Sequence, residues 1–426
     1  MTPGKQAPGN LSIAIDPKNA NVVYLAGDRY DTCADKPPAS FCSLQAFRVN
    51  YNPSNKSSTA TSLTIEGTLA QGFLDANTAH ADSRAMAFDA AGNLILSSDG
   101  SIYLRNNPLG NGTWQGLNGN LSVFEPFVTA YDANSKRLAV AAQDNGVSLQ
   151  SAPGNPLFKP INGGDGVNVA INDKTLAGAG LSVIYSTTQA LGGPSRMIIN
   201  AQGQVVSSSD IKCNNMDCDA FTNAGKNFFA PFVLNRIDPT RIAIGGATDV
   251  YVARDTLSNV GNADVNLALT NLGTTAGPSV ISYGTADNVQ ALAVGAGPIP
   301  QEPEIDPTAG PTTGTKPPQG QVWFTASTTP GSSLTQLNQY AGGAPTSIVF
   351  DTRTQSRIFV ADGANLYYTR TATTGALANF TSPTSFPAGF TRSTAVEFIS
   401  NNGVNAILVG GLNTPLPGTC TSTPNG

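Results

Sequence analysis

The stretch RAMAFDAAGNLILSSDGSIYLR, residues 84–105, contains one complete unit of a pattern that recurs along the chain. A short apolar strand leads into a turn of Asp, Ala, Gly and Asn, and a second apolar strand and a third short strand follow. Asp and Asn favour such turns because their side chains bond nearby backbone groups and tolerate left-handed conformations. The stretch therefore predicts an antiparallel meander rather than a helix.

The same pattern recurs in seven other segments, at intervals of about 40 to 70 residues, which fits one propeller blade per copy. These segments are residues 11–28, 127–149, 166–189, 232–254, 279–297, 346–370 and 394–411. A single unit cannot bury both faces of its sheet, but blades stacked around an axis can. The sequence therefore predicts an all-β fold, a β-propeller of four-stranded blades, with seven blades or alternatively eight.

The repeat also predicts the organisation of the chain. Residues 1–10 are expected to be an N-terminal tail and residues 11–426 a single propeller. Residues 298–319 are rich in Pro, which is typical of a loop insertion within a blade. The copy at 394–411 has only two strands, so we expect the last blade to be truncated and the natural chain to continue past Gly426.

Composition excludes several classes of protein. Charged residues make up 12% of the chain and the net charge is −5, which argues against a nucleic-acid partner. No stretch reaches the roughly 20 apolar residues of a membrane-spanning helix, so direct membrane insertion is not expected. The N-terminal MTPGKQAPGN has no apolar core of a signal peptide, so any export signal is absent from this chain.

Four cysteines form two close pairs in sequence, Cys33 with Cys42 and Cys213 with Cys218, while Cys420 is left over. Each pair would close a short loop if oxidised. Zinc binding usually requires four Cys or His ligands at short spacings, and the chain has no C-x-x-C motif and one histidine. The pairs therefore favour two loop disulfides.

The histidine lies in a polar segment that precedes the strand of residues 84–105. If that segment is extended, His80, Asp82 and Arg84 share one face and could border the central channel. The alternative is that they satisfy backbone groups of neighbouring loops. Asp144 and Asp165 lie near the next two repeats, where carboxyl groups could cleave a glycosidic bond, bind Ca²⁺, or only support turns.

Another set of aspartates recurs at one position of the repeat, at the end of the first strand of a hairpin. Such periodic use indicates a role in the turns, because an active site is usually asymmetric. These residues are Asp89, Asp132, Asp238 and Asp351.

The order of several short motifs resembles that of the BNR-repeat, sortilin-like and xyloglucanase-like β-propellers, which are glycosyl-hydrolase-like by fold. The matching motifs cover roughly residues 80–255 and are individually short. They are His80-Ala81-Asp82-Ser83-Arg84, Asp99-Gly100 before Tyr103, Gln143-Asp144-Asn145-Gly146, Gly163-Gly164-Asp165-Gly166 and Pro231-Phe232-Val233-Leu234. The resemblance implies a secreted, extracellular or cell-surface protein.

The chain departs from this pattern where catalysis is concerned. It has no intact S-x-D-x-G-x-T-W box, which is common in related hydrolases, and only two tryptophans, Trp114 and Trp323. Aromatic residues make up 7% of the chain, which is sparse for a polysaccharide cleft built from stacking platforms. These features favour a non-enzymatic protein.

We therefore predict a non-catalytic interaction or structural module that binds a protein or a glycan at the cell surface. The alternative is a carbohydrate-active enzyme with an acidic pair at the channel mouth, drawn from Asp82, Asp144 and Asp165. No cofactor is expected, with Ca²⁺ at Asp144 and Asp165 as the one candidate. The predicted binding residues are His80, Asp82, Arg84, Gln143, Asp144 and Asp165.

Overall fold

The structure is a computed structural model that describes residues 10–29, 44–64, 79–117, 126–213, 226–297, 319–372, 384–385, 390–401 and 404–413. Outside these ranges lie residues 1–9 of the predicted tail, residues 298–318 of the predicted insertion, and Cys33, Cys42, Cys218 and Cys420. Cys213 is disulfide-bonded. The pairings of Cys33 with Cys42 and of Cys213 with Cys218 stay predictions.

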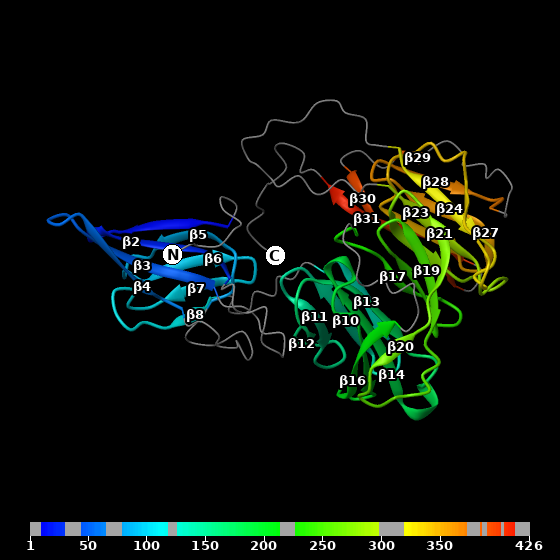
Figure 1. The fold of residues 1–426 in the computed structure, drawn as a ribbon, viewed down its shortest axis with the longest axis horizontal. Helices are drawn as coiled ribbons and strands as arrows, with labels where there is room; N and C mark the ends of the chain where they lie inside the picture. Colours follow the sequence, from blue (N-terminus) through cyan, green and yellow to red (C-terminus); the bar gives the residue numbers. More distant parts are fainter. Residues whose placement is uncertain are drawn as a thin grey trace. The chain divides into compact units, whose positions relative to one another are not determined.

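The described residues form eight β-sheets that follow one another along the chain (Figure 1). The first contains β1 (Ser12–Asp16), β2 (Asn19–Arg29), β3 (Leu44–Asn52) and β4 (Ser57–Ser62). The second contains β5 (Ser83–Phe88), β6 (Leu94–Ser98), β7 (Ile102–Arg105) and β8 (Trp114–Gly116). The third contains β9 (Val128–Asp132), β10 (Arg137–Ala142), β11 (Gly146–Gln150) and β12 (Phe158–Asn162).

The fourth sheet has a fifth strand, which comes from later in the chain. It contains β13 (Gly166–Asn172), β14 (Leu181–Thr188), β15 (Ser195–Asn200), β16 (Val205–Cys213) and, parallel to β16, β20 (Val265–Leu267). Two short 3-10 helices, η2 (Ala177–Ala179) and η3 (Gln189–Leu191), flank β14. The fifth sheet contains β17 (Phe232–Leu234), β18 (Arg241–Gly245), β19 (Asp249–Arg254) and β21 (Thr270–Thr274).

The remaining sheets complete the series. The sixth contains β22 (Pro278–Tyr283), β23 (Leu292–Ala296), β24 (Gln321–Thr325) and β25 (Thr335–Gln336). The seventh contains β26 (Ser347–Asp351), β27 (Thr354–Ala361), β28 (Asn365–Thr369) and β29 (Thr384–Ser385). The eighth contains β30 (Phe390–Asn401) and β31 (Val404–Asn413). Among the described residues, no helix is both long and apolar enough to span a membrane.

This architecture confirms the all-β prediction and the four-stranded unit of a β-propeller. Within most sheets, neighbouring strands are also consecutive in sequence and antiparallel, as in a meander. Each of the eight predicted repeats corresponds to one sheet, and the last has two described strands.

The chain divides into two compact units, and the predicted single propeller of residues 11–426 stays a prediction. Unit 1 comprises Met1–Pro126, Ala142–Ser148 and Pro156–Gly166. Unit 2 comprises Phe127–Ala141, Leu149–Asn155 and Val167–Gly426.

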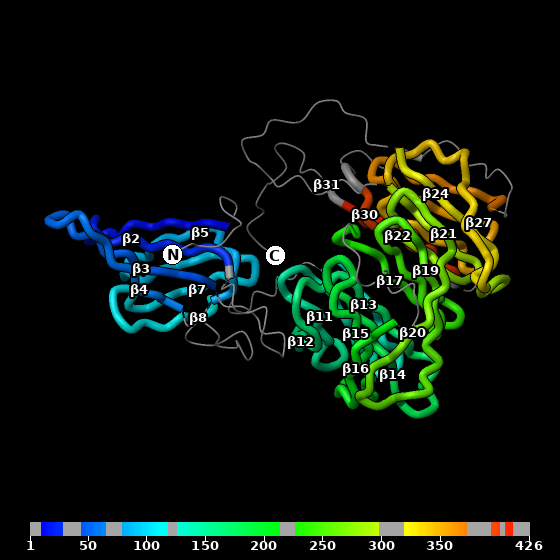
Figure 2. The backbone as a smooth tube through the Cα atoms, in the orientation of Figure 1, coloured from blue at the N-terminus to red at the C-terminus, as the bar shows by residue number. Residues whose placement is uncertain are grey.

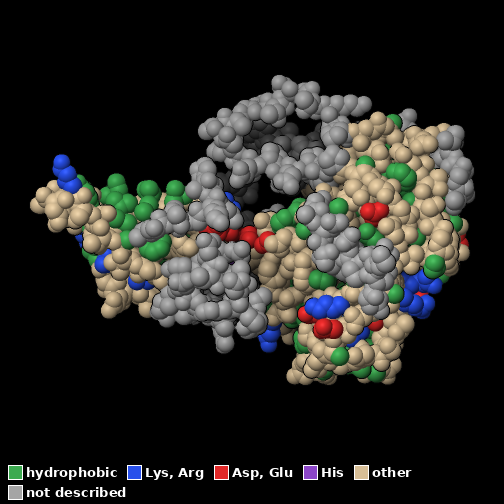
Figure 3. All heavy atoms as spheres, in the orientation of Figure 1, with side chains coloured by type: hydrophobic (Ala, Val, Ile, Leu, Met, Phe, Trp, Pro, Cys, Tyr) green, Lys and Arg blue, Asp and Glu red, His purple; other side chains and the backbone are tan. Residues whose placement is uncertain are grey.

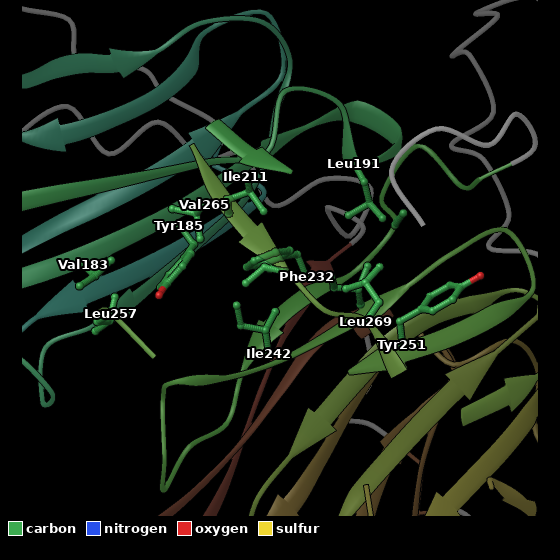
Figure 4. Close-up of a cluster of buried hydrophobic side chains, with 13 residues drawn as sticks. Val183, Tyr185, Leu191, Ile211, Phe232, Ile242, Tyr251, Leu257, Val265 and Leu269 are labelled. Carbon is green, nitrogen blue, oxygen red and sulfur yellow. The ribbon is translucent and has the colours of Figure 1, made fainter. Parts of the chain in front are cut away.

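Within each unit, the apolar core lies between successive sheets. In unit 2, Tyr185 of β14 and Phe232 of β17 are buried with their ring centroids 6.0 Å apart, and Ile242 of β18 joins them (Figure 4). In unit 1, buried Tyr24 of β2 packs edge-on against partly buried Phe88 of β5, with the ring centroids 5.3 Å apart. Full burial of one such side chain stabilises the fold by roughly 1.5–3 kcal/mol. Alternating apolar residues therefore place one sheet against the next.

The predicted turn role of the periodic aspartates is confirmed. Each carboxylate accepts a hydrogen bond from a backbone N–H two to four residues further along the chain, which closes the hairpin. The pairs are Asp89 with Asn93, Asp132 with Asn134, Asp238 with Thr240 and Asp351 with Arg353. The turns are therefore stabilised locally, independently of any ligand.

Replacing Asp132 by Ala is expected to destabilise the fold by about 3 kcal/mol, because buried donors lose their charged acceptor. The Asp132 side chain is fully buried, and its carboxylate accepts the backbone N–H of Ser135 at 3.2 Å and the Ser182 hydroxyl at 2.6 Å. The measurement is urea unfolding followed by circular dichroism. The matched control is Asp89→Ala in the less buried β5–β6 turn, and an equal loss in both variants would contradict the argument.

Candidate functional site

The segment that precedes β5 is not extended. Asp82 has a φ of 62°, a left-handed conformation, and β5 begins only at Ser83. The prediction that His80, Asp82 and Arg84 share one face by strand alternation is therefore wrong. The left-handed residue turns the backbone, so the relation between these side chains is set by the turn.

The turn nevertheless gathers acidic residues from separate parts of unit 1. Asp82, Asp99 and Asp144 each offer one ligand atom, and these atoms lie within 4.8 Å of one another. Asp82 precedes β5, Asp99 follows β6, and Asp144 lies between β10 and β11. Asp165, just before β13, contacts Asp144. We call Asp28, Asp82, Asp99, Asp144 and Asp165 the carboxyl cluster.

His80 links the segment before β5 to the β10–β11 loop, because its imidazole contacts a backbone carbonyl oxygen in each. Its Nε2 lies 3.0 Å from the carbonyl oxygen of Asp144, and its Nδ1 lies 3.1 Å from that of Ala81. Carbonyl oxygens only accept, so a neutral ring donates one of these bonds and a protonated ring donates both. A Cβ on Gly100 would lie 2.4 Å from the imidazole, so this position requires glycine. These contacts indicate a structural role for His80.

Asp99 pairs with Arg84 through two parallel hydrogen bonds. The guanidinium donates Nε to one carboxylate oxygen at 2.7 Å and Nη2 to the other at 2.8 Å. The Asp99 side chain is 22% exposed and that of Arg84 is 49% exposed. The bonds to Asp99 raise the pKa of Arg84, and its positive charge partly offsets the charge of the cluster.

Asp82 is partly buried beside other carboxyl groups. Its Oδ1 accepts the Asn10 side-chain amide at 2.8 Å. Burial raises the pKa of Asp82 to about 6, and the charges of Asp28 and Asp99 and a side-chain hydrogen bond with Asp28 add to the shift. His80 acts in the opposite direction. Asp82 and Asp28 therefore form a carboxyl pair that favours a shared proton.

Asp144 and Asp165 form a second carboxyl pair. Asp144 has a φ of 57°, and its backbone N–H donates to Oδ1 of Asp165 at 3.2 Å. Burial raises the pKa of Asp144 to about 8, helped by a side-chain hydrogen bond with Asp165 and by the Asp165 charge. The carboxyl groups of Asp99 and Asp82 contribute less. Three residues join β10 to β11, so this loop is longer than a two-residue type I′ turn.

The two carboxyl pairs occupy equivalent places in the repeat. Asp28 and Asp144 lie at the end of a second strand or just after it, and Asp82 and Asp165 lie in the linker before the next sheet. Sequence reasoning missed Asp28 and Asp99 as members of the site. The available signal was an Asp at the end of the second strand in successive repeats.

Gln143 is exposed beside the cluster, and its carbonyl accepts the Asn145 side-chain amide at 2.9 Å. Its predicted role in binding stays a prediction.

The cluster includes oxygens at a spacing that suits a cation. Two oxygens bound to one Ca²⁺ at about 2.3–2.6 Å can be at most about 5 Å apart, and the oxygens of Asp82, Asp99 and Asp144 meet that limit. The Arg84 guanidinium already donates hydrogen bonds to both carboxylate oxygens of Asp99. Arg84 therefore supplies positive charge beside these oxygens. The Ca²⁺ site predicted at Asp144 and Asp165 stays a prediction.

Comparisons with known proteins support no assignment to a family. No protein-family model matches the chain, and no curated protein matches it. Among solved structures, the chain is similar to Sqt1 from Chaetomium thermophilum, with 12% identity and a TM-score of 0.41 over 95% of this chain and 97% of that one. It is also similar to an ancestral GH74 enzyme, with 10% identity and a TM-score of 0.46 over 93% of this chain and 63% of that one. At these values the likeness carries no information on ligand or activity.

The carboxyl pairs predict an unusual pH dependence of stability. The pKa values of Asp82 and Asp144 are raised from 3.8, so the folded state holds protons that the unfolded chain has released. Their contribution to the free energy of unfolding is therefore complete below about pH 4 and is lost as the pH rises through about 6 and about 8. Asp144→Asn is expected to stabilise the protein by about 1 kcal/mol at pH 8, after discounting for partial exposure, with little effect at pH 4. Denaturant unfolding at both pH values measures this difference.

The control for that experiment is Asp89→Asn. Hydrogen bonds from Asn93 lower the pKa of Asp89, so its contribution has the opposite sign and appears above pH 4. The variant should therefore show no gain at pH 8. Equal stability of Asp144→Asn and the parent protein at pH 8 would refute the shared-proton arrangement.

Proposed function

We propose that the protein is a non-catalytic interaction module of the cell surface or extracellular space, which binds a protein or a glycan near the carboxyl cluster. The placement outside the cell rests on the motif series shared with BNR-repeat, sortilin-like and xyloglucanase-like propellers. The sheets act as a scaffold, and the loops after the second strands and before the next sheets present the binding groups.

The observation that carries this proposal is that the carboxyl groups bind one another and other protein groups. Asp144 bonds Asp165, Asp82 bonds Asp28, and Asp99 bonds Arg84. A glycosidase instead requires two carboxyl groups that face the scissile bond from opposite sides, with carboxyl separations of about 5 Å or more. The hydrogen-bonded carboxyl groups of Asp144 with Asp165, and of Asp82 with Asp28, lie closer together than such a pair.

The two tryptophans also favour binding without polysaccharide cleavage. Trp114 is 3% exposed and donates its Nε1 to the Leu63 carbonyl at 2.8 Å. Trp323 packs against the core between the fifth and sixth sheets, and its Nε1 donates to Gln321. Both indoles therefore serve packing, whereas a polysaccharide cleft needs rings exposed to sugar faces.

The surface is compatible with a neutral partner. In Figure 3 the charged side chains form small groups separated by neutral surface. This agrees with the 12% charged residues of the chain. Long-range electrostatic steering is therefore a minor factor, and recognition depends on local hydrogen bonds and shape.

The proposal is tested by measuring hydrolysis and binding in parallel. On a panel of soluble polysaccharides, release of reducing ends by the parent chain should equal that of an Asp82→Asn, Asp144→Asn, Asp165→Asn triple variant. Hydrolysis by the parent that the triple variant lacks would overturn the non-catalytic proposal in favour of the carbohydrate-active alternative.

The binding arm uses a glycan array with the labelled parent and triple variant. Retention of the parent, with loss in the triple variant, would identify a glycan ligand at the cluster. A blank array would restrict the proposal to a protein partner. Equal retention of both chains would place the glycan site elsewhere and contradict the role of the cluster.

A further inference from the structure

The linker between the third and fourth sheets follows an asparagine and begins with a glycine. Asn162 is the last residue of β12, which lies beside β11 in the third sheet (Figure 2). Gly163, Gly164 and Asp165 then lead into β13. Asn162 and Gly163 are half-buried and Gly164 is exposed, so water reaches this linker.

The side-chain amide of Asn162 lies against the backbone nitrogen of the next residue. The Gly163 N–H donates a hydrogen bond to Oδ1 of Asn162, with the nitrogen 2.9 Å from the oxygen. Because a C=O bond is about 1.23 Å long, Cγ of Asn162 lies at most about 4 Å from that nitrogen. Reacting atoms in a near-attack arrangement are about 3–3.5 Å apart. The Asn162 amide is therefore held close to the geometry for attack by the Gly163 nitrogen.

This arrangement suits closure of a five-membered imide ring. The hydrogen bond polarises the amide carbonyl, and a glycine has no Cβ to obstruct the approach. After solvent hydroxide takes the N–H proton, the Gly163 nitrogen forms a bond to Cγ of Asn162. The bond from Cγ to the side-chain nitrogen breaks, and that nitrogen leaves as ammonia with protons from solvent. Water then opens the imide at either carbonyl, which gives aspartate or isoaspartate.

Another asparagine–glycine pair in unit 1 has a different geometry. Asn145 precedes Gly146 in the β10–β11 loop, and its Nδ2 donates to the Gln143 carbonyl at 2.9 Å. This bond directs the amide toward an earlier residue of the loop. Gly146 is buried and begins β11. Since both asparagines precede glycine, a difference in their reactivity would come from the fold.

We propose that Asn162 is a self-modifying site, at which the folded structure favours conversion to aspartate and isoaspartate without an enzyme. The product carries one additional negative charge. Isoaspartate also adds one atom to the main chain, just before the linker that ends at Asp165. The chemistry needs no bound partner, so it is independent of the proposed binding function.

The carboxyl cluster is connected to this site through Asp165. The backbone N–H of Asp144 donates to Oδ1 of Asp165 at 3.2 Å. The loop that contains Asp144 also packs tightly on the linker, because a Cβ on Gly146 would lie 2.2 Å from the carbonyl oxygen of Asn162. A longer main chain at Asn162 must therefore shift the linker or the loop. Conversion is expected to weaken the contact between Asp144 and Asp165.

Peptide mapping by mass spectrometry, during incubation of the full chain at mildly alkaline pH, tests the site. The native protein should convert Asn162 at least about tenfold faster than Asn145, because a misplacement of about 1 Å can cost a rate factor of about 100. In the guanidinium-denatured chain the two rates should become similar. Gly163→Ala should suppress conversion of Asn162 and leave the rate at Asn145 unchanged.

Two results would overturn the proposal. One is conversion of Asn145 in the native protein at a rate equal to or above that of Asn162. The other is the same ratio of rates in the native and the denatured chain, because the preference would then come from the sequence alone.

Denaturant unfolding of the converted fraction, separated by anion exchange, tests the connection to the cluster. The converted fraction should unfold at a lower denaturant concentration than the unconverted fraction. In Asp165→Ala this difference should be smaller, because the contact with Asp144 is already absent. An equal difference in both chains, or no difference in the parent chain, would contradict the connection through Asp165.

Discussion

Inner strands such as β18 are buried on both faces, so the stability of these sheets depends on packing against neighbouring sheets. The clusters around Phe232, Tyr24 and Phe350 each draw side chains from two consecutive sheets. Because alternate residues of a strand point to opposite faces, one strand contributes to two such clusters. A turn between two strands consequently has little freedom, since both strands are held by separate neighbours. This constraint explains why polar side chains at the strand ends have fixed positions although they lie in loops.

The carboxyl cluster is a consequence of this arrangement. The end of a second strand and the linker to the next sheet lie close together, so Asp28 meets Asp82 and Asp144 meets Asp165. The fold brings these acids together without a bound substrate, and shared protons and Arg84 reduce their repulsion. The carboxyl groups of the cluster are therefore held in place by one another and by Arg84.

Much of the fold could be predicted from the sequence because its signals are local. The aspartate turns such as that of Asp89 and the alternation of apolar residues act within a single hairpin, so each repeat was recognised. The site was predicted less well. The left-handed backbone of Asp82 leaves no mark in a pattern of residue types, and the partners of Asp99 are known only from the packed structure. The parallel strand β20 was also missed, because pairing over long distances is not encoded in its own few residues.

The fourth and fifth sheets are linked by the chain itself around β20, in addition to the packing between them. β19 and β21 belong to the fifth sheet, whereas β20, which lies between them in sequence, belongs to the fourth. The segment that makes this excursion is anchored by the buried ion pair of Arg196 with Asp255, whose carboxylate also accepts the Tyr185 hydroxyl. Neither sheet can open fully while the other keeps all its strands. We therefore expect the fourth and fifth sheets to unfold as one cooperative unit, within which amide hydrogens exchange together.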